Sequence, residues 1–139
     1  MLVSDVNAGA AACVAIATGA TVVSAAGILS AEADIFAPCA LGGGIDEVAA
    51  GKLRAKVVCG AANNQPATTA DGDRLAERDI LYALDYVVNA GGIINVAAEY
   101  LGWPQADSNA RVEATADPLA DVFTHSETHG ACLLYTSDA

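Results

Sequence analysis

Short apolar runs alternate with longer segments along most of the chain. The apolar runs predict strands buried on both faces, at residues 2–4, 21–25, 34–36, 56–59 and 80–82. The segments between and after them predict helices, at residues 7–18, 45–53, 71–79, 85–100 and 108–128. Continuous apolar strands separated by helices indicate a parallel sheet covered on both faces, with right-handed crossovers. The predicted fold class is therefore α/β, a doubly wound parallel sheet.

Polar and small residues follow several of the predicted strands. A doubly wound sheet binds its ligand at the carboxyl ends of its strands, so residues at or just beyond those ends are expected to form one site. The residues in these positions are Asp5, Cys39, Ala40, Ala62, Asn63 and Asn89.

Asp5 has two interpretations that the residues alone do not separate. An acid between the first strand and the first helix of a dinucleotide fold can accept hydrogen bonds from ribose hydroxyls. It would also repel a 2′-phosphate, which favours NAD over NADP. Asp is equally a common N-cap, and a helix is predicted to start near Asn7.

The other candidates combine small side chains with amides. Cys39 and Ala40 follow a proline, where small residues let a ribose or pyrophosphate approach the backbone, although a simple tight turn explains them too. Asn63 offers a donor and an acceptor, which suits ribose hydroxyls or a carboxamide. Its neighbours Asn64 and Gln65 are expected to hold the backbone of their own loop. The glycine run at residues 42–44 does not complete a GxGxxG fingerprint.

Composition narrows the classes of function. The formal net charge is −11 and only six residues are Lys or Arg, which argues against nucleic acid as a partner. Residues 6–31 carry no charge, but they are mostly Ala and Gly with interspersed Thr and Ser, so we expect no membrane span. The four cysteines show no CxxC spacing, which favours a reducing, cytoplasmic compartment, and we expect no metal site.

Three blocks of the sequence resemble a known enzyme family. They cover residues 34–43, 59–65 and 85–92, and their order and spacing are similar to the cofactor-binding half of the leucine, valine, phenylalanine and glutamate dehydrogenases. The branched-chain members are the most similar. The resemblance implies a Rossmann-like fold, NAD as cofactor, a small amino-acid substrate and a homo-oligomeric parent enzyme.

The resemblance also implies roles for individual residues. Asp5 would bind the adenosine ribose, Cys39 and Ala40 would line the nicotinamide ribose, and Asn63 would contact the nicotinamide nucleoside. Asn89 would face both the nicotinamide and the substrate. Leu84 departs from the branched-chain pattern, which has a proline there, so the loop before Asn89 loses a fixed φ.

The resemblance further implies an incomplete enzyme. Residues 1–131 are expected to be a partial dinucleotide-binding domain that misses its first strand and Gly-rich turn, and the substrate domain with its catalytic lysine is expected upstream. Residues 132–139 leave the family pattern and resemble translated sequencing adaptor. The chain alone is therefore expected to be inactive.

Two functions remain open from the sequence. The first is a cofactor-domain fragment of an NAD-dependent amino-acid dehydrogenase that oxidatively deaminates a branched-chain or other apolar L-amino acid to its 2-oxo acid and ammonia. The alternative is a non-catalytic, Rossmann-type nucleotide-binding or regulatory module. That alternative leaves unpaired strand edges inside a parallel sheet, which is an aggregation hazard.

Overall fold

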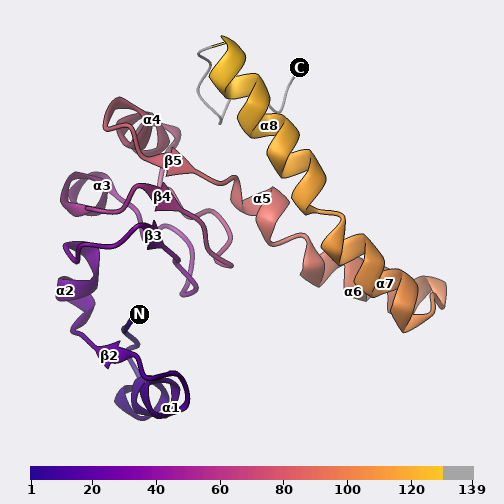
Figure 1. Cartoon of the computed structure of the whole chain (residues 1–139), viewed down its shortest axis with the longest axis horizontal. Coiled ribbons are helices and arrows are strands. Elements are labelled where there is room, and N and C mark those ends of the chain that lie inside the picture. The colour runs from indigo at the N-terminus through magenta and orange to yellow at the C-terminus, as the bar shows by residue number, and fades with distance from the viewer. Residues whose placement is uncertain (130–139) are drawn as a thin grey trace.

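The structure is a computed structural model that describes residues 1–129, without the side chains of residues 126, 127 and 129. The expected non-family tail at residues 132–139 lies outside the described residues. Strands and helices alternate up to the last strand, and four helices follow it (Figure 1). The strands are β1 (Leu2–Val3), β2 (Thr21–Val22), β3 (Ile35–Phe36), β4 (Val57–Val58) and β5 (Leu81–Tyr82). The helices are α1 (Ala8–Thr18), α2 (Ala25–Leu29), α3 (Glu47–Lys52), α4 (Thr69–Glu77), α5 (Asp85–Val88), α6 (Gly91–Leu101), α7 (Gln105–Glu113) and α8 (Ala116–His129).

All strand pairs of the described residues are parallel, which confirms the predicted α/β class. They form two sheets, however: β1 pairs with β2, and the second sheet has the order β3-β4-β5. Leu2 pairs with Thr21 in the first sheet, and Val57 lies between Ile35 and Leu81 in the second. Within residues 1–129 no ladder joins the two sheets, so the single continuous sheet expected from the sequence is not formed by these residues alone.

Three predicted boundaries are wrong for local reasons. The strand predicted at 21–25 ends early because the Ser24 side chain accepts a hydrogen bond from Gly27 N at 3.1 Å and starts α2. The helix predicted at 85–100 is interrupted, since α5 ends at Val88 and α6 begins at Gly91. The helix predicted at 108–128 begins earlier, at Gln105, and is divided between α7 and α8.

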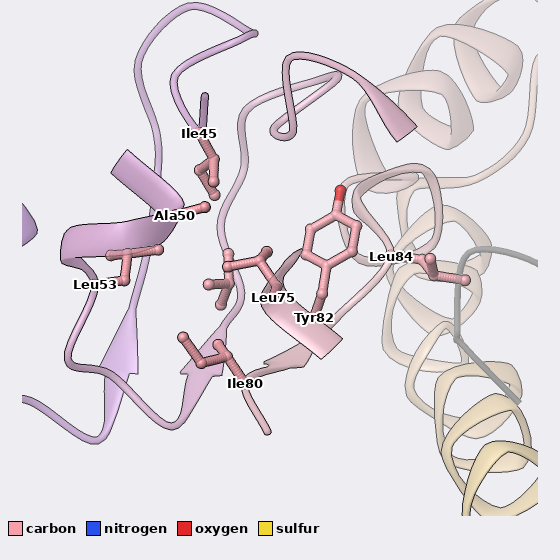
Figure 2. Packing of buried hydrophobic residues seen from close by; sticks show 8 residues of the cluster. Ile45, Ala50, Leu53, Leu75, Ile80, Tyr82 and Leu84 are labelled. Atoms are coloured by element: carbon pink, nitrogen blue, oxygen red, sulfur yellow. The ribbon is translucent and has the colours of Figure 1, made fainter. Parts of the chain in front are cut away.

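The hydrophobic core lies around the three-stranded sheet. Eight buried residues from α3, α4, β4, β5 and the adjoining loops form one cluster (Figure 2). Phe36 of β3 and Val122 and Phe123 of α8 pack against it. Burial of this apolar surface is the main stabilising contribution to the fold. The cluster consists of Ile45, Ala50, Leu53, Val58, Leu75, Ile80, Tyr82 and Leu84.

The helices after β5 form a separate part of the molecule. Helices α6, α7 and α8 lie at the opposite end from α1 (Figure 1), and α8 also contacts α5. The Arg111 guanidinium of α7 stacks over the Trp103 ring, with 4.2 Å between the guanidinium carbon and the ring centroid. No helix in the described part of the chain is both long and apolar enough to cross a membrane.

Candidate functional site

Two loops at the carboxyl ends of β3 and β4 are joined by backbone hydrogen bonds. Ala62 N donates to Pro38 O at 3.0 Å, and Gly43 N donates to Asn64 O at 2.7 Å. These bonds continue the pairing of β3 and β4 beyond the strands themselves. The loop that carries Cys39 and Ala40 is therefore fixed beside the loop that carries Asn63, as the rule for parallel sheets predicts.

Two glycines allow this close contact. A Cβ atom on Gly60 would lie under 3.0 Å from backbone atoms of Pro38, and one on Gly42 would lie under 3.0 Å from Asn63 O. Real Cβ atoms essentially never approach so closely, so both positions require glycine for space. Our sequence analysis connected the run at residues 42–44 only with flexibility and gave Gly60 no role.

The amides of Asn63 and Asn89 meet directly. Asn89 follows α5 as its C-cap residue, and its Nδ2 donates to Asn63 Oδ1 at 2.7 Å and to Ala62 O at 3.4 Å. These two residues are 26 positions apart in the sequence, and the strand-end argument placed them in one site. The shared bond uses the Asn89 donor and the Asn63 acceptor. Asn63 Nδ2 and Asn89 Oδ1 thus provide one donor and one acceptor for a further group.

The small residues of the predicted site differ in exposure. Cys39 and Ala40 are exposed, as close approach by a ligand requires. Ala62 is buried, with 5% of its surface exposed. Its carbonyl oxygen, which accepts from Asn89 and Gln65, is its contribution to the site.

Gln65 and Asp85 support the loop from below. Gln65 is 1% exposed, and its Nε2 donates to Gly60 O at 2.6 Å and to Ala62 O at 2.9 Å, which confirms the expected backbone-holding role. The Asp85 carboxylate accepts from Gln65 N at 3.3 Å and from Tyr86 N at 3.0 Å. The sequence analysis missed Asp85, because an acid in the first turn of a helix is ordinary and gives no signal of burial.

Asp5 follows β1, as predicted, but stands apart from the other candidates. Its Oδ1 accepts from Asn7 N at 2.7 Å, and Asn7 is the residue that caps α1 by accepting from Ala10 N at 3.1 Å. Asp5 is thus not the N-cap itself, although it shapes the turn before the cap. In the described residues it forms no hydrogen bond with the other five candidates, and its ribose-binding role stays a prediction.

The described residues contain no cluster of three or more His, Cys, Asp or Glu suited to a metal ion. The two lysines also lie away from the amide pair. Lys52 ends α3, and Lys56 lies before β4, at the other end of that strand from Asn63. Lys56 pairs with Asp34 at 2.8 Å, and this hydrogen bond and charge lower the pKa of Asp34.

Comparison with known proteins agrees with this arrangement. The family model for glutamate, leucine, phenylalanine and valine dehydrogenases matches residues 3–129. Leucine dehydrogenase from Bacillus cereus is 39% identical over 138 residues, which cover 99% of this chain and 38% of that enzyme. Valine dehydrogenase from Streptomyces virginiae is 48% identical over 97 residues, or 70% of this chain and 27% of that enzyme.

A solved structure agrees along nearly the whole chain. The crystal structure of L-tryptophan dehydrogenase from Nostoc punctiforme matches with a TM-score of 0.95 and 38% identity, over 99% of this chain and 42% of that one. The chain thus spans less than half the length of these relatives. The chain belongs to the glutamate, leucine, phenylalanine and valine dehydrogenase family.

Proposed function

We propose that this chain is the cofactor-binding part of an NAD-dependent amino-acid dehydrogenase. The complete enzyme would oxidatively deaminate a branched-chain or other apolar L-amino acid to its 2-oxo acid and ammonia. The similarity to leucine and valine dehydrogenases supports this class of substrate. The observation that carries the proposal is the Asn63–Asn89 amide pair at the carboxyl ends of the strands.

The chemistry of this pair fits the nicotinamide end of the cofactor. A carboxamide has one acceptor oxygen and one donor nitrogen, and the pair offers Asn63 Nδ2 and Asn89 Oδ1 in return. The exposed Cys39 and Ala40 leave room for a ribose against the backbone. When bound, NAD supplies the hydride acceptor, and the residues of this chain would orient it.

Asp5 fits the other end of the cofactor. One carboxylate oxygen is engaged by Asn7 N, and the side chain is exposed just beyond β1. A ribose diol could bind there, whereas a 2′-phosphate would meet a negative charge. We therefore expect NAD to bind more tightly than NADP.

The open sheet edges support the idea that a further strand belongs to the domain. Thr21 N donates to Met1 O and Val23 N to Val3 O, so β1 uses these carbonyls toward β2. Asp34 O and Phe36 O of the β3 segment accept from β4 residues in the same way. Because alternate residues of a strand address opposite neighbours, Leu2 and Ile35 present their backbone groups away from these partners.

One parallel strand between β1 and β3 would unite the two sheets. Figure 1 places the N-terminal end, where β1 begins, between β2 and β3 in that view. We infer that polypeptide outside these 139 residues supplies the strand, its Gly-rich turn and the catalytic lysine, in a homo-oligomeric enzyme. The chain alone is expected to bind NAD weakly and to turn over no L-leucine.

Titration of the full chain with NAD and NADP, followed by NMR, tests this proposal. Asn63→Ala should weaken NAD binding about tenfold, since it removes a hydrogen-bond donor to the carboxamide. Asn109→Ala is the matched control, because Asn109 lies on α7 and bonds only to Gln105 among the interactions of the described residues. Equal affinities for the two variants, or a preference for NADP, would contradict the proposal.

A further inference from the structure

Two buried polar atoms near the amide pair find no hydrogen-bond partner within the described part of the chain. They are Oε1 of Gln65 and the hydroxyl of Tyr82. Gln65 is 1% exposed and Tyr82 is 5% exposed, so neither atom is open to bulk solvent. Buried polar groups in native proteins are nearly always satisfied, by protein or by ordered water. Two orphaned groups in one small region therefore indicate a missing common partner.

Both groups are neighbours of the same carboxylate. Asp85 is 8% exposed, and its Oδ2 accepts from Gln65 N at 3.3 Å. Burial, followed by the charge of Asp85, raises the pKa of the Tyr82 hydroxyl. The Tyr82 ring belongs to the apolar cluster, but its oxygen points away from the other labelled side chains (Figure 2).

We propose that Gln65, Tyr82 and Asp85 bind one ordered water molecule, and that this buried water site positions the Asn63–Asn89 pair. The bonding capacities match. The water would donate one hydrogen to Gln65 Oε1 and the other to the Asp85 carboxylate, and it would accept the proton of the Tyr82 hydroxyl. Three such bonds are typical of a buried water that satisfies otherwise unpaired groups.

The site is connected to both asparagines through short covalent paths. Gln65 is two residues after Asn63, and its Nε2 bonds hold Gly60 O and Ala62 O on the same loop. Asp85 begins α5, and its carbonyl accepts from Asn89 N at 2.9 Å. A water shared by Gln65 and Asp85 would therefore fix the loop against the helix. Gln65, Tyr82 and Asp85 act as positioning residues, which do not touch the cofactor.

Tyr82→Phe gives opposite results for the two possible states of the hydroxyl. If it binds the water, its removal should lower the thermal midpoint of unfolding by about 4 °C. If the hydroxyl has no partner, its removal relieves a desolvation cost, and the midpoint should stay constant or rise. Tyr100→Phe is the matched control, because Tyr100 is 89% exposed on α6, and its midpoint should equal that of the unsubstituted chain.

The positioning role needs a readout that stability alone does not move. The side-chain amide NMR resonances of Asn63 and Asn89 should shift in Tyr82→Phe at a temperature where the variant is fully folded, and stay unchanged in Tyr100→Phe. Unchanged resonances in both variants would overturn this role. A crystal structure of the full chain should show water density within hydrogen-bond distance of Gln65 Oε1 and the Tyr82 hydroxyl, and its absence would overturn the water site even if Tyr82→Phe fails to fold.

This inference depends on the proposed function only for what the amide pair binds. If the unsubstituted chain does not bind NAD, the proposed function fails, while the resonances and the density still decide the inference. If the chain does bind NAD, Tyr82→Phe should weaken binding about threefold, because the amide pair is less preorganised.

Discussion

The two sheets are built from the same parallel unit but are stabilised unequally. In the first, β1, α1 and β2 bury one residue, Ala11, below a tenth of its surface. In the second, the eight-residue cluster of Ile45–Leu84 packs between strands and helices. Val6 and Ile16 of the first unit are instead almost fully exposed. The hydrophobic contribution to stability therefore comes mainly from the second unit.

Local signals do not explain this difference, since both units define their helices well. Helix α1 has the Asn7 cap at its start and Gly19 in the left-handed conformation, with φ of 72°, at its end. Helix α4 has a capping box between Thr68 and Asp71. Capping fixes where a helix begins and ends, but tertiary packing supplies most of its stability. The comparison thus separates the formation of an element from its anchoring.

Truncation of one apolar side chain in each unit tests this difference most strongly. Leu75→Ala removes a fully buried side chain from the core and should lower the free energy of unfolding by about 2–5 kcal/mol. Ile16→Ala removes an 86% exposed side chain and should change it by less than about 0.5 kcal/mol. Urea denaturation measures both values. Equal losses would show that α1 is packed as well as α4, and the comparison would not hold.

Glycine substitutions sharpen the comparison at the backbone. Gly60→Ala introduces a Cβ into backbone atoms of Pro38, so we expect a loss of about 3 kcal/mol and a displaced loop around Asn63. Gly19→Ala meets no atom within 4 Å and should cost only about 1 kcal/mol, through its left-handed φ.

Gly51→Ala serves as the control for these two variants. It lies inside α3 with open space around it, and alanine is the better helix former by about 1 kcal/mol. Thermal unfolding should therefore rank the variants Gly51→Ala, Gly19→Ala and Gly60→Ala in order of falling stability. A Gly60→Ala variant as stable as the unsubstituted chain would refute the close packing of the two site loops.

The sequence predicted the alternation of strands and helices because apolar runs and their punctuation are local signals. It failed where a short polar group or a change of direction interrupts an apolar pattern. Ser24 ends a predicted strand by capping α2, and Asn89 and Ala90 interrupt a predicted helix whose apolar pattern continues to Tyr100. The division into two sheets was also missed, because strand edges are paired by residues far apart in the sequence.

The site was predicted to the extent that it follows from strand ends. That rule found Asn63 and Asn89, which bond to each other. It did not find the need for glycine at residues 42 and 60, since the contact with the opposite loop exists only after β3 and β4 pair. The burial of Asp85 was hidden for the same reason, because the atoms that cover and bind it come from a distant loop.

The smallest expected effect concerns the pH dependence of the two helix starts. The hydrogen bond from the Thr68 side chain holds the pKa of Asp71 below its ordinary value of 3.8, with Arg74 contributing further. A lowered pKa stabilises the fold above the ordinary value, and this stabilisation is lost as the pH falls through the lowered value. Asp71→Asn should therefore have a lower thermal midpoint than the unsubstituted chain at pH 7, and this gap should close toward pH 2.

The first unit provides the contrast for this titration. Its cap, Asn7, is an amide that does not titrate, so Asn7→Ala should lower the midpoint by the same amount at pH 7 and at pH 3. Two parallel midpoint curves, one for each pair of proteins across pH 2–7, make the comparison. If the Asp71→Asn gap stays constant with pH, the Asp71 carboxylate does not stabilise α4 through its charge. Its cap is then equivalent to the uncharged one on α1, and the two units differ in packing alone.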